Sequence, residues 1–245
     1  MDLTTVKNEI IVESNKYRLG PRVLKLHKLT EGSATKITKI RNVNGAIVPD
    51  LGSTPISLLD MDSFFVFPLT LKMPILFPNE VFEDNDLAQV FQKSLSETFH
   101  FASIENKLVV EVLIAGAGKT IASQSKPNVR EIPILDNFIS AIRFIEDNRY
   151  HPDTILVHPS IAETLRQRDE LKEKLVAYAI EVLVESSVPE GVVIILDSKH
   201  SGLLIERVSP EVSEYVDNWN QQKGFLLRSR VAPVITDGNA VVVIS

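Results

Sequence analysis

The chain has 245 residues, of which 44% are hydrophobic and 24% are charged, a composition that excludes a disordered protein and allows a sizeable core in one or two domains. Its 26 Lys and Arg residues against 32 Asp and Glu residues leave a net charge of −6, which excludes a global basic field for holding nucleic acid but not a local basic patch. The absence of cysteine excludes disulfides, thiolate metal sites and cysteine nucleophiles.

No apolar run in the sequence reaches the ~20 residues that are needed to cross a bilayer. The longest runs, such as VLIAGA and VVIIL, fall well short of that length. Residues 1–13 carry acidic side chains where a secretory signal would carry basic ones. These observations predict a cytosolic protein without a membrane partner.

Residues 1–34 show weak periodicity. Ile10, Ile11 and Val12 form a short apolar cluster, which a series of basic side chains follows. One interpretation is a surface arm whose charges are solvated. The other is an arm that packs along a neighbouring subunit or the inner face of an assembly, because an arm with little core of its own gains most by docking on another surface.

Residues 36–41 and 65–73 alternate between apolar and polar side chains, which predicts two β-strands. The sequence between them contains NGAIVPDLGSTPIS, whose Gly, Pro, Asn and Ser residues are typical of turns. The pattern therefore predicts a long two-stranded ribbon. Because an isolated ribbon is marginally stable in water, this one must pack either on its own domain or on a neighbour.

The sequence of residues 83–117 predicts a long helix, around which the rest of the chain is organised. Apolar side chains recur at helical spacing from Leu87 to Val112, behind Asp84 and Asp86, whose carboxylates suit a helix N-terminus. A single helix of about thirty residues would be roughly 45 Å long. Such a helix predicts an elongated molecule rather than a globule.

The second half of the sequence predicts an amphipathic helix followed by mostly β-structure. The helix has apolar side chains from Leu135 to Ile145 and stops before Pro152. Predicted strands follow at residues 154–157, 180–184, 192–196, 203–207, 225–231 and 241–244. The fold class is therefore α+β.

Patterns that resemble catalytic or ligand-binding motifs have the wrong spacing. Leu113 stands where a phosphate-binding loop ending in Gly118-Lys119-Thr120 needs its first glycine, so Gly116 and Gly118 are better explained as a helix end and a turn. The five histidines lack metal-binding spacing, and no serine has the context of a nucleophile. We expect no catalytic residue, no metal site and no cofactor, while a small nucleotide-binding enzyme remains an alternative.

Ordered segments of the chain carry a family resemblance. Residues 74–106 combine a strand, the acidic and apolar segment Glu80-Val81-Phe82-Glu83-Asp84 and the long helix. Residues 135–159 place a helix before Tyr150-His151-Pro152-Asp153, and further segments lie at 188–191, 205–207, 227–231 and 240–244. Together they resemble the tailed-phage major capsid family of the Hong Kong ninety-seven type, although Asn148-Arg149 stands where that family often has a glycine.

The resemblance implies an α+β fold of four parts. On this chain, residues 1–35 would be an N-terminal arm and residues 36–73 an extended hairpin, the E-loop. Residues 74–126 would form a peripheral domain with a long spine helix, completed by C-terminal strands 232–245. Residues 127–231 would form an axial domain.

The resemblance also implies a self-assembling shell protein that forms a closed icosahedral compartment and is not an enzyme. One hypothesis is an encapsulin, a cytoplasmic nanocompartment that takes up cargo enzymes through a short tail docking on its inner wall. The other is the major capsid protein of a virus or provirus that packages DNA. The chain starts almost directly with the arm and is acidic, and both features favour the nanocompartment.

Cargo contact is assigned by the resemblance to the N-terminal region. Ile10, Ile11 and Val12, together with the spine helix, would line the inner surface of the shell. Deletion of residues 1–19 should then release cargo and leave the shell fold intact.

Two further regions are assigned to assembly. Phe64, Phe65 and Phe67 lie on the predicted ribbon and would contact a neighbouring subunit. Lys199 and His200 lie in a predicted turn of the axial domain and would line a pore. The chain would then have itself as its main partner.

Overall fold

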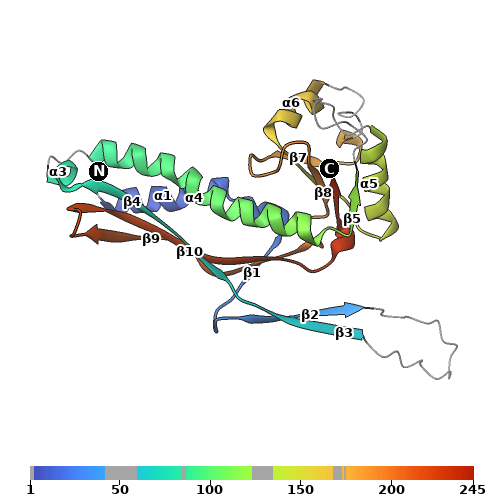
Figure 1. Cartoon of the computed structure of the whole chain (residues 1–245), viewed down its shortest axis with the longest axis horizontal. Helices are drawn as coiled ribbons and strands as arrows, with labels where there is room; N and C mark the ends of the chain where they lie inside the picture. Colours follow the sequence, from blue (N-terminus) through green and yellow to red (C-terminus); the bar gives the residue numbers. More distant parts are fainter. Residues whose placement is uncertain (1–2, 42–59, 84–86, 123–134, 168–172, 174) are drawn as a thin grey trace.

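The computed structural model describes residues 3–41, 60–83, 87–122, 135–167, 173 and 175–245. The molecule has three parts: an elongated layer in which helices cover a sheet, a compact lobe around a second sheet, and a two-stranded ribbon that projects from the elongated layer (Figure 1). The elongated outline agrees with the shape that the long helix predicts.

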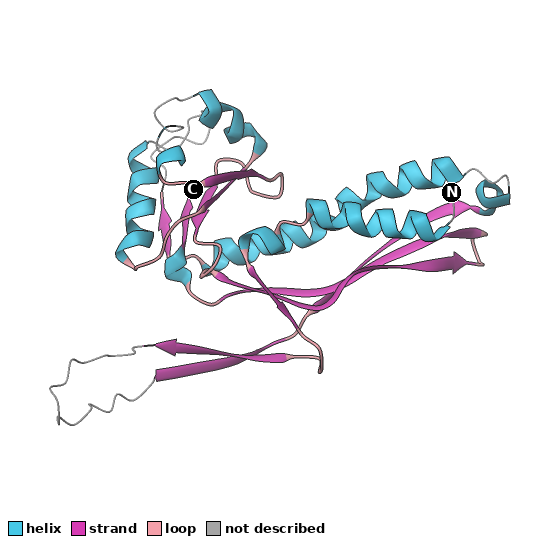
Figure 2. Cartoon of the chain, turned by 180° about the vertical axis from the view of Figure 1, so that it is seen from behind, coloured by secondary structure: helices cyan, strands magenta, loops and turns pink. Residues whose placement is uncertain are grey.

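The elongated layer is built on a four-stranded sheet. In order across the sheet, its strands are β1 (Lys25–Lys28), β9 (Gly202–Asp217), β10 (Gln222–Ile235) and β4 (Leu69–Pro78). β9 and β10 form a long antiparallel hairpin, and β4 pairs with the other edge of β10. Helices α1 (Leu3–Tyr17) and α4 (Leu87–Gly116) lie side by side over one face of this sheet, with the short helices α2 (Gly20–Val23) and α3 (Asn79–Glu83) nearby (Figure 2).

The long helix predicted from apolar spacing is α4, which has 30 residues. Its buried side chains recur every three or four residues and pack on α1 and on the sheet; they include Val90, Phe101, Val109 and Leu113. The prediction is confirmed for this helix, while Asp84 and Asp86 lie outside the described residues.

The N-terminal segment differs from the arm that the sequence predicts, because it has a core of its own. Val6 and Ile10 of α1 are fully buried and pack in one cluster with Phe101 of α4 and Phe225 of β10. Their four-residue spacing places both side chains on the same face of the helix. The expectation of an arm with little core is therefore wrong for α1.

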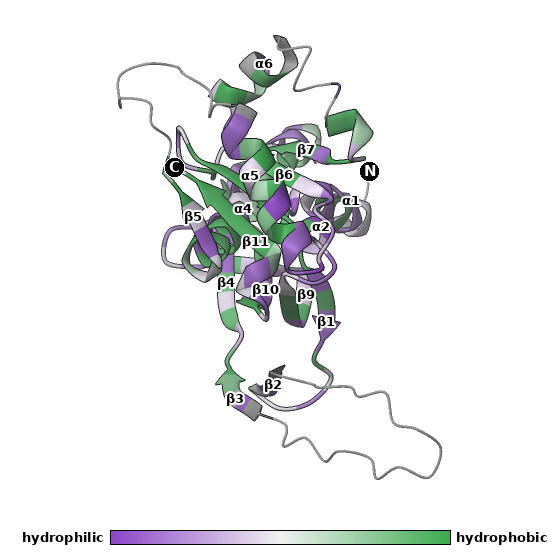
Figure 3. Ribbon diagram, turned by 90° about the vertical axis from the view of Figure 1, so that its right-hand side faces the viewer, coloured by the Kyte–Doolittle hydropathy of each residue, from purple (hydrophilic) through white to green (hydrophobic). Residues whose placement is uncertain are grey.

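The compact lobe is built on a five-stranded sheet. In order, its strands are β5 (Lys119–Ile121), β11 (Val241–Ile244), β8 (Val193–Leu196), β6 (Thr154–Val157) and β7 (Glu181–Val184). All residues of β6, β8 and β11 are buried, and the colouring by hydropathy shows these strands as an apolar centre (Figure 3). Helices α5 (Leu135–Asp147) and α6 (Pro159–Gln167) contribute to the same core.

The strand pairings divide the C-terminal half differently from the domain boundaries proposed above. β9 and β10, which cover residues 202–235, belong to the sheet beneath α4 rather than to the lobe of β6 and β8. β11, expected with the domain of the long helix, pairs instead with β8 and β5, after the short helix η1 (Gly238–Ala240). The chain therefore crosses between the two sheets at residues 197–202 and again at 236–240.

The predicted ribbon is present but its second strand is broken. β2 (Thr35–Arg41) pairs with β3 (Asp60–Val66) as an antiparallel pair, whereas β4 begins at Leu69 and pairs with β10. The break falls at Pro68, which has no N–H to donate to a neighbouring strand. The predicted turn at residues 42–59 lies outside the described residues.

Candidate functional site

Exposed apolar side chains recur at every second residue where the ribbon strand β3 leads into β4, and this set is called the exposed row. Phe65, Phe67 and Leu69 are 66%, 64% and 54% exposed. Phe65 lies on β3, Phe67 in the link before Pro68, and Leu69 at the start of β4. The sequence predicts Phe65 and Phe67 as contact residues, and Leu69 continues the same period two residues later.

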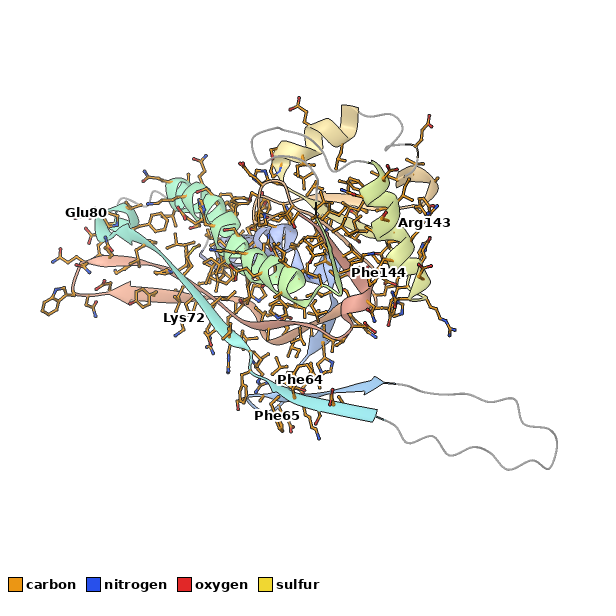
Figure 4. All side chains as sticks on the ribbon, turned by 45° about the vertical axis from the view of Figure 1, so that its right-hand side comes forward. Phe64, Phe65, Lys72, Glu80, Arg143 and Phe144 are labelled. Carbon is orange, nitrogen blue, oxygen red and sulfur yellow. The ribbon has the colours of Figure 1, made fainter. Side chains whose placement is uncertain are left out.

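Phe64 points the other way and is not part of the exposed row. It is half-buried and, with Val66, packs in a cluster that contains Ile37 of β2 and Ile205 and Ala232 of the four-stranded sheet (Figure 4). Phe64 therefore helps to anchor the ribbon to its own body, and its contact with a neighbouring subunit stays a prediction. One face of the ribbon is therefore packed internally and the other is open, and contact of the open face with a neighbour stays a prediction.

The predicted cargo residues on α1 also face in different directions. Ile10 is fully buried, Ile11 is half-buried and Val12 is 53% exposed. Because a helix turns once in about 3.6 residues, Val12 shares its face with the exposed polar residues Asn8 and Lys16. Ile10 is therefore a core residue, and only Ile11 and Val12 remain candidates for contact with another molecule.

An exposed aromatic pair lies where α1 and α4 meet. The rings of Tyr17 and Phe99 are 5.6 Å apart and nearly perpendicular, and the two residues are 42% and 46% exposed. Sequence reasoning missed this pair, because neither residue belongs to an apolar run. The pair leaves exposed aromatic surface where the two helices meet.

A buried charge cluster fixes the end of α1. Arg18 donates from Nε to Glu105 Oε1 at 3.0 Å and from Nη2 to Glu206 Oε2 at 2.7 Å. All three side chains are at most 5% exposed, and Ser209 donates a further hydrogen bond to Glu206 at 2.6 Å. Burial raises the pKa of Glu105, although the charge of Arg18 opposes the rise. The cluster joins α1, α4 and β9.

The neighbouring Asn106 completes this junction. Its Oδ1 accepts a hydrogen bond from the N–H of Leu19 at 2.7 Å, and its Nδ2 donates to the carbonyl of Tyr17 at 2.9 Å. The same Nδ2 donates to Glu185 Oε2 at 2.9 Å, which ties α4 to the compact lobe. The N-terminal segment is therefore built into both parts of the molecule.

The turn with Lys199 and His200 is held by Asp197. The carboxylate accepts hydrogen bonds from the N–H groups of His151 and Lys199, both at 3.0 Å, and lies 2.8 Å from His200 Nδ1. Burial would raise the pKa of Asp197, but these bonds hold it below its ordinary value. The ring centroids of Tyr150 and His200 are 5.6 Å apart.

This turn is the crossing from β8 to β9, at the junction of the two sheets. Lys199 and His200 are exposed there. Tyr150 donates a hydrogen bond to Asp237 at 2.6 Å, which raises the pKa of Tyr150 to about 12. These contacts hold the turn between the two sheets. Its place in a pore stays a prediction.

The glycine-rich segment after α4 has a structural role. A Cβ on Gly118 would lie 2.6 Å from the carbonyl oxygen of Gly238, so the two chains approach closely at this point. Lys119 follows on the edge strand β5, with its ammonium 5.1 Å from the ring centroid of Phe144. The prediction that Gly116 ends the helix is confirmed, and Lys119 is engaged by a ring rather than placed in a phosphate loop.

Other kinds of site find no support in the described part of the chain. Among those residues, no group of three or more His, Asp or Glu side chains is arranged to hold a metal ion. Within the same residues, no helix is long and apolar enough to span a membrane.

Comparison with known proteins gives matches at the level of structure. No protein-family model and no curated protein sequence matches this chain. The virus-like particle from Pyrococcus furiosus aligns over 99% of this chain and 98% of its own, with a TM-score of 0.77 at 14% identity. The capsid of the native GTA particle aligns over 91% and 88%, with a TM-score of 0.69 at 10% identity.

A third match extends the comparison to a phage-related protein from Bordetella bronchiseptica, which aligns over 97% of this chain and 96% of its own with a TM-score of 0.63 at 12% identity. The chain has the Hong Kong ninety-seven type capsid fold. The predicted α+β capsid fold is thus confirmed, with α4 as its spine helix and β2–β3 as its projecting hairpin.

Proposed function

We propose that this chain is the subunit of a closed icosahedral protein shell, and that the shell is an encapsulin-like nanocompartment in the cytoplasm that encloses a cargo protein. The observation that carries the proposal is the end-to-end structural agreement with the virus-like particle of Pyrococcus furiosus, which leaves almost no part of either chain unmatched. The role is mechanical: the subunit encloses a volume and its pores filter what enters. We infer that it is not an enzyme.

The exposed row of Phe65, Phe67 and Leu69 supports self-association. Three neighbouring exposed apolar side chains are unusual on a monomer, and patches of this kind mark contact surfaces. Burying one large apolar side chain contributes about 1.5–3 kcal/mol. A shell repeats the contact around its symmetry axes, so a modest gain per subunit becomes cooperative.

The alternative function is the major capsid protein of a virus or provirus that packages DNA. The likeness to the capsid of the GTA particle favours it. The net charge of −6 is the opposing observation, because an acidic subunit gives no general attraction for nucleic acid. The two functions differ in what the particle contains, so they are separable by experiment.

Cargo contact is proposed for the helix side of the elongated layer, at Val12, Ile11 and the Tyr17–Phe99 pair. These residues are exposed or half-exposed and come from the two helices that cover the sheet. Deletion of residues 1–19 is not a suitable test, because it would remove the buried Ile10 and leave Glu105 without Arg18. Single substitutions on the exposed face avoid this problem.

The first experiment measures particle mass by light scattering on the recombinant protein, together with its ultraviolet absorbance ratio. A uniform megadalton species with a protein-like ratio is expected. A nucleic-acid-like ratio would favour the viral alternative. A monomer or dimer at all concentrations and salt conditions would contradict shell formation and revive the small nucleotide-binding enzyme.

Matched variants then locate the contacts. The double variant F65S/F67S should stay folded and lose assembly, because both rings are exposed in the subunit. Ile104→Ser serves as the control, since Ile104 is 43% exposed on α4 and outside the row. For cargo, Phe99→Ser and Val12→Lys should each deplete the protein that copurifies with the wild-type particle, while the particle mass stays constant.

A further inference from the structure

The single tryptophan of the chain is almost entirely in solvent. Trp219 lies in the turn between β9 and β10 and is 94% exposed. Tryptophan has the largest apolar surface of any side chain and is highly buried on average in folded proteins. An exposed indole in this position therefore needs a physical explanation that the subunit alone does not provide.

The turn holds Trp219 in a fixed position. The carboxylate of Asp217 accepts hydrogen bonds from the N–H of Trp219 at 3.0 Å and from the N–H of Asn220 at 3.2 Å. It also accepts one from Asn220 Nδ2 at 2.8 Å. The next residue, Gln221, has a φ of 53°, a left-handed conformation that costs free energy for a non-glycine residue.

The end of β4 supports this turn from the side. The N–H of Asn79 donates to the carbonyl of Gln221 at 3.2 Å, next to the last strand pair, Pro78 with Gln222. Four hydrogen bonds fix the backbone of this turn, so little backbone entropy is left to lose when the turn binds another molecule. The geometry is that of a contact prepared in advance.

The turn also lies at an extremity of the molecule. The β9–β10 hairpin ends at one tip of the long axis, away from the β2–β3 ribbon and the compact lobe (Figure 1). Near the tip, Tyr215 and Val216 of β9 are 40% and 51% exposed, and their alternation along the strand places one on each face of the hairpin. The tip around Trp219 and the β2–β3 ribbon are therefore two separate surfaces of the subunit.

We infer that Trp219 is an inter-subunit anchor, which inserts into a second copy of this chain when the shell assembles. The inference rests on the proposed function. A closed shell leaves no free rim, so the tip of an elongated subunit faces another subunit. Tryptophan is among the residue types enriched at the energetic centres of protein interfaces, with tyrosine and arginine.

The area required for assembly supports a second copy as the partner. A stable interface buries about 800 Å² on each partner, whereas a large aromatic side chain supplies about 150–250 Å². The row of Phe65, Phe67 and Leu69 is therefore too small to hold a shell together by itself. A second apolar contact around Trp219, at the opposite tip, adds buried apolar area to the contact made by the exposed row.

Because the chain has one tryptophan, its fluorescence reports on Trp219 alone. The emission spectrum and its quenching by acrylamide are compared between wild-type particles and the unassembled F65S/F67S subunit. In the free subunit we expect red-shifted emission and strong quenching. In the particle we expect blue-shifted emission and a quenching constant that is lower by several fold.

A second measurement uses substitution. Trp219→Ser should raise the protein concentration needed for assembly by tenfold or more, and Trp219→Phe should restore part of the loss. Tyr178→Ser is the matched control, because Tyr178 is an aromatic residue 37% exposed in the compact lobe. The free subunits of all three variants should have unchanged thermal unfolding midpoints.

The outcomes separate this inference from the proposed function. Particles whose Trp219 emission and quenching equal those of the free subunit would overturn the inference and leave shell formation standing. If Trp219 is protected from acrylamide only when cargo is present, the inference is overturned as well, because the partner of Trp219 would then be cargo. A wild-type chain that forms no particle would overturn both.

Discussion

The Nε of Arg18, at the end of α1, lies within hydrogen-bonding distance of both carboxylate oxygens of Glu105 on α4, at 3.0 and 3.1 Å. Glu206 of β9 accepts from the same guanidinium, so one buried cation serves two buried carboxylates. A buried charge without a partner is strongly unfavourable. The N-terminal helix is therefore held to the body by electrostatics as well as by its apolar face.

Replacement of Arg18 tests this junction. Arg18→Ala should lower the free energy of unfolding by about 3–5 kcal/mol, because it leaves two carboxylates buried without their cation. Urea denaturation of the unassembled subunit measures the change. Lys16→Ala is the control, since the pair of Lys16 and Glu13 lies at the surface, where solvent screens the charges and the effect on stability should be small. Equal effects of the two variants would refute the structural role of Arg18.

Glu105 gives this cluster a defined pH dependence. Burial raises its pKa in the folded state above the ordinary value of 4.5, so its contribution to stability is fully present below 4.5 and is lost as the pH rises through the folded-state pKa. Gln does not ionise, so Glu105→Gln does not lose this contribution as the pH rises. The free energy of unfolding of Glu105→Gln minus that of wild type should therefore increase with pH and level off above the folded-state pKa of Glu105.

The measurement is a series of urea titrations from acidic to neutral pH. Glu13 provides a control of opposite sign, because its hydrogen bonds with Lys16 and Tyr17 lower its pKa. Stability from Glu13 is present above the unfolded-state pKa and is lost as the pH falls. If the difference in free energy of unfolding between Glu105→Gln and wild type does not change with pH, Glu105 is not desolvated in solution.

Part of the fold could be read from apolar spacing alone. The helix α4 and the buried strands β6, β8 and β11 have continuous or periodic apolar side chains, and the sequence predicts each of them. β9 is different, because its outer half carries exposed side chains such as Glu211 and Glu214. Glu214 pairs with Lys7 of α1 and Glu211 with Arg228 of β10, contacts that the sequence does not reveal. The predicted strand was therefore shorter than the observed one.

The candidate site shows the same limit. Period-two spacing separates Phe64 from Phe65 and Phe67, but it does not say which of them pack on the body: only the structure shows that Phe64 is half-buried and that Phe65 and Phe67 are exposed. The charge cluster is harder to predict from the sequence, since Arg18 lies 87 positions from Glu105 and 188 positions from Glu206. Only the folded chain brings such residues together.

Gly224 marks the closest approach of β10 to β4. A Cβ at this position would lie 1.9 Å from the carbonyl oxygen of Ile75, a backbone atom that cannot move aside without breaking the strand pair. Gly224→Ala should therefore cost about 1–3 kcal/mol or more, as overpacking does in cores. Ser213→Ala, at an exposed position on β9, should change the free energy of unfolding by less than about 0.5 kcal/mol.

Chemical denaturation of both variants checks this prediction. The destabilisation by Gly224→Ala should be accompanied by faster hydrogen exchange of amides in β4, because the clash acts on that pair of strands. A Gly224→Ala protein as stable as Ser213→Ala would show that β4 and β10 lie further apart than the structure places them.

Lys72 on β4 lies directly opposite Arg228 on β10, so two cations face each other across neighbouring strands. Arg228 has a partial partner in Glu211, at 3.4 Å, whereas like charges in opposed positions are destabilising. Lys72→Glu replaces the repulsive pair with an attractive one. The free energy of unfolding should rise by about 0.2–1 kcal/mol at low salt.

Lys72→Gln separates the two contributions, because it removes the repulsion without adding an attraction. Its stability should fall between those of wild type and Lys72→Glu, and the differences should shrink as salt screens the charges. If Lys72→Glu is less stable than wild type at low salt, an interaction of Lys72 outweighs the repulsion from Arg228. If the variant subunit is more stable but no longer assembles, the positive charge of this sheet face is used between subunits rather than within one.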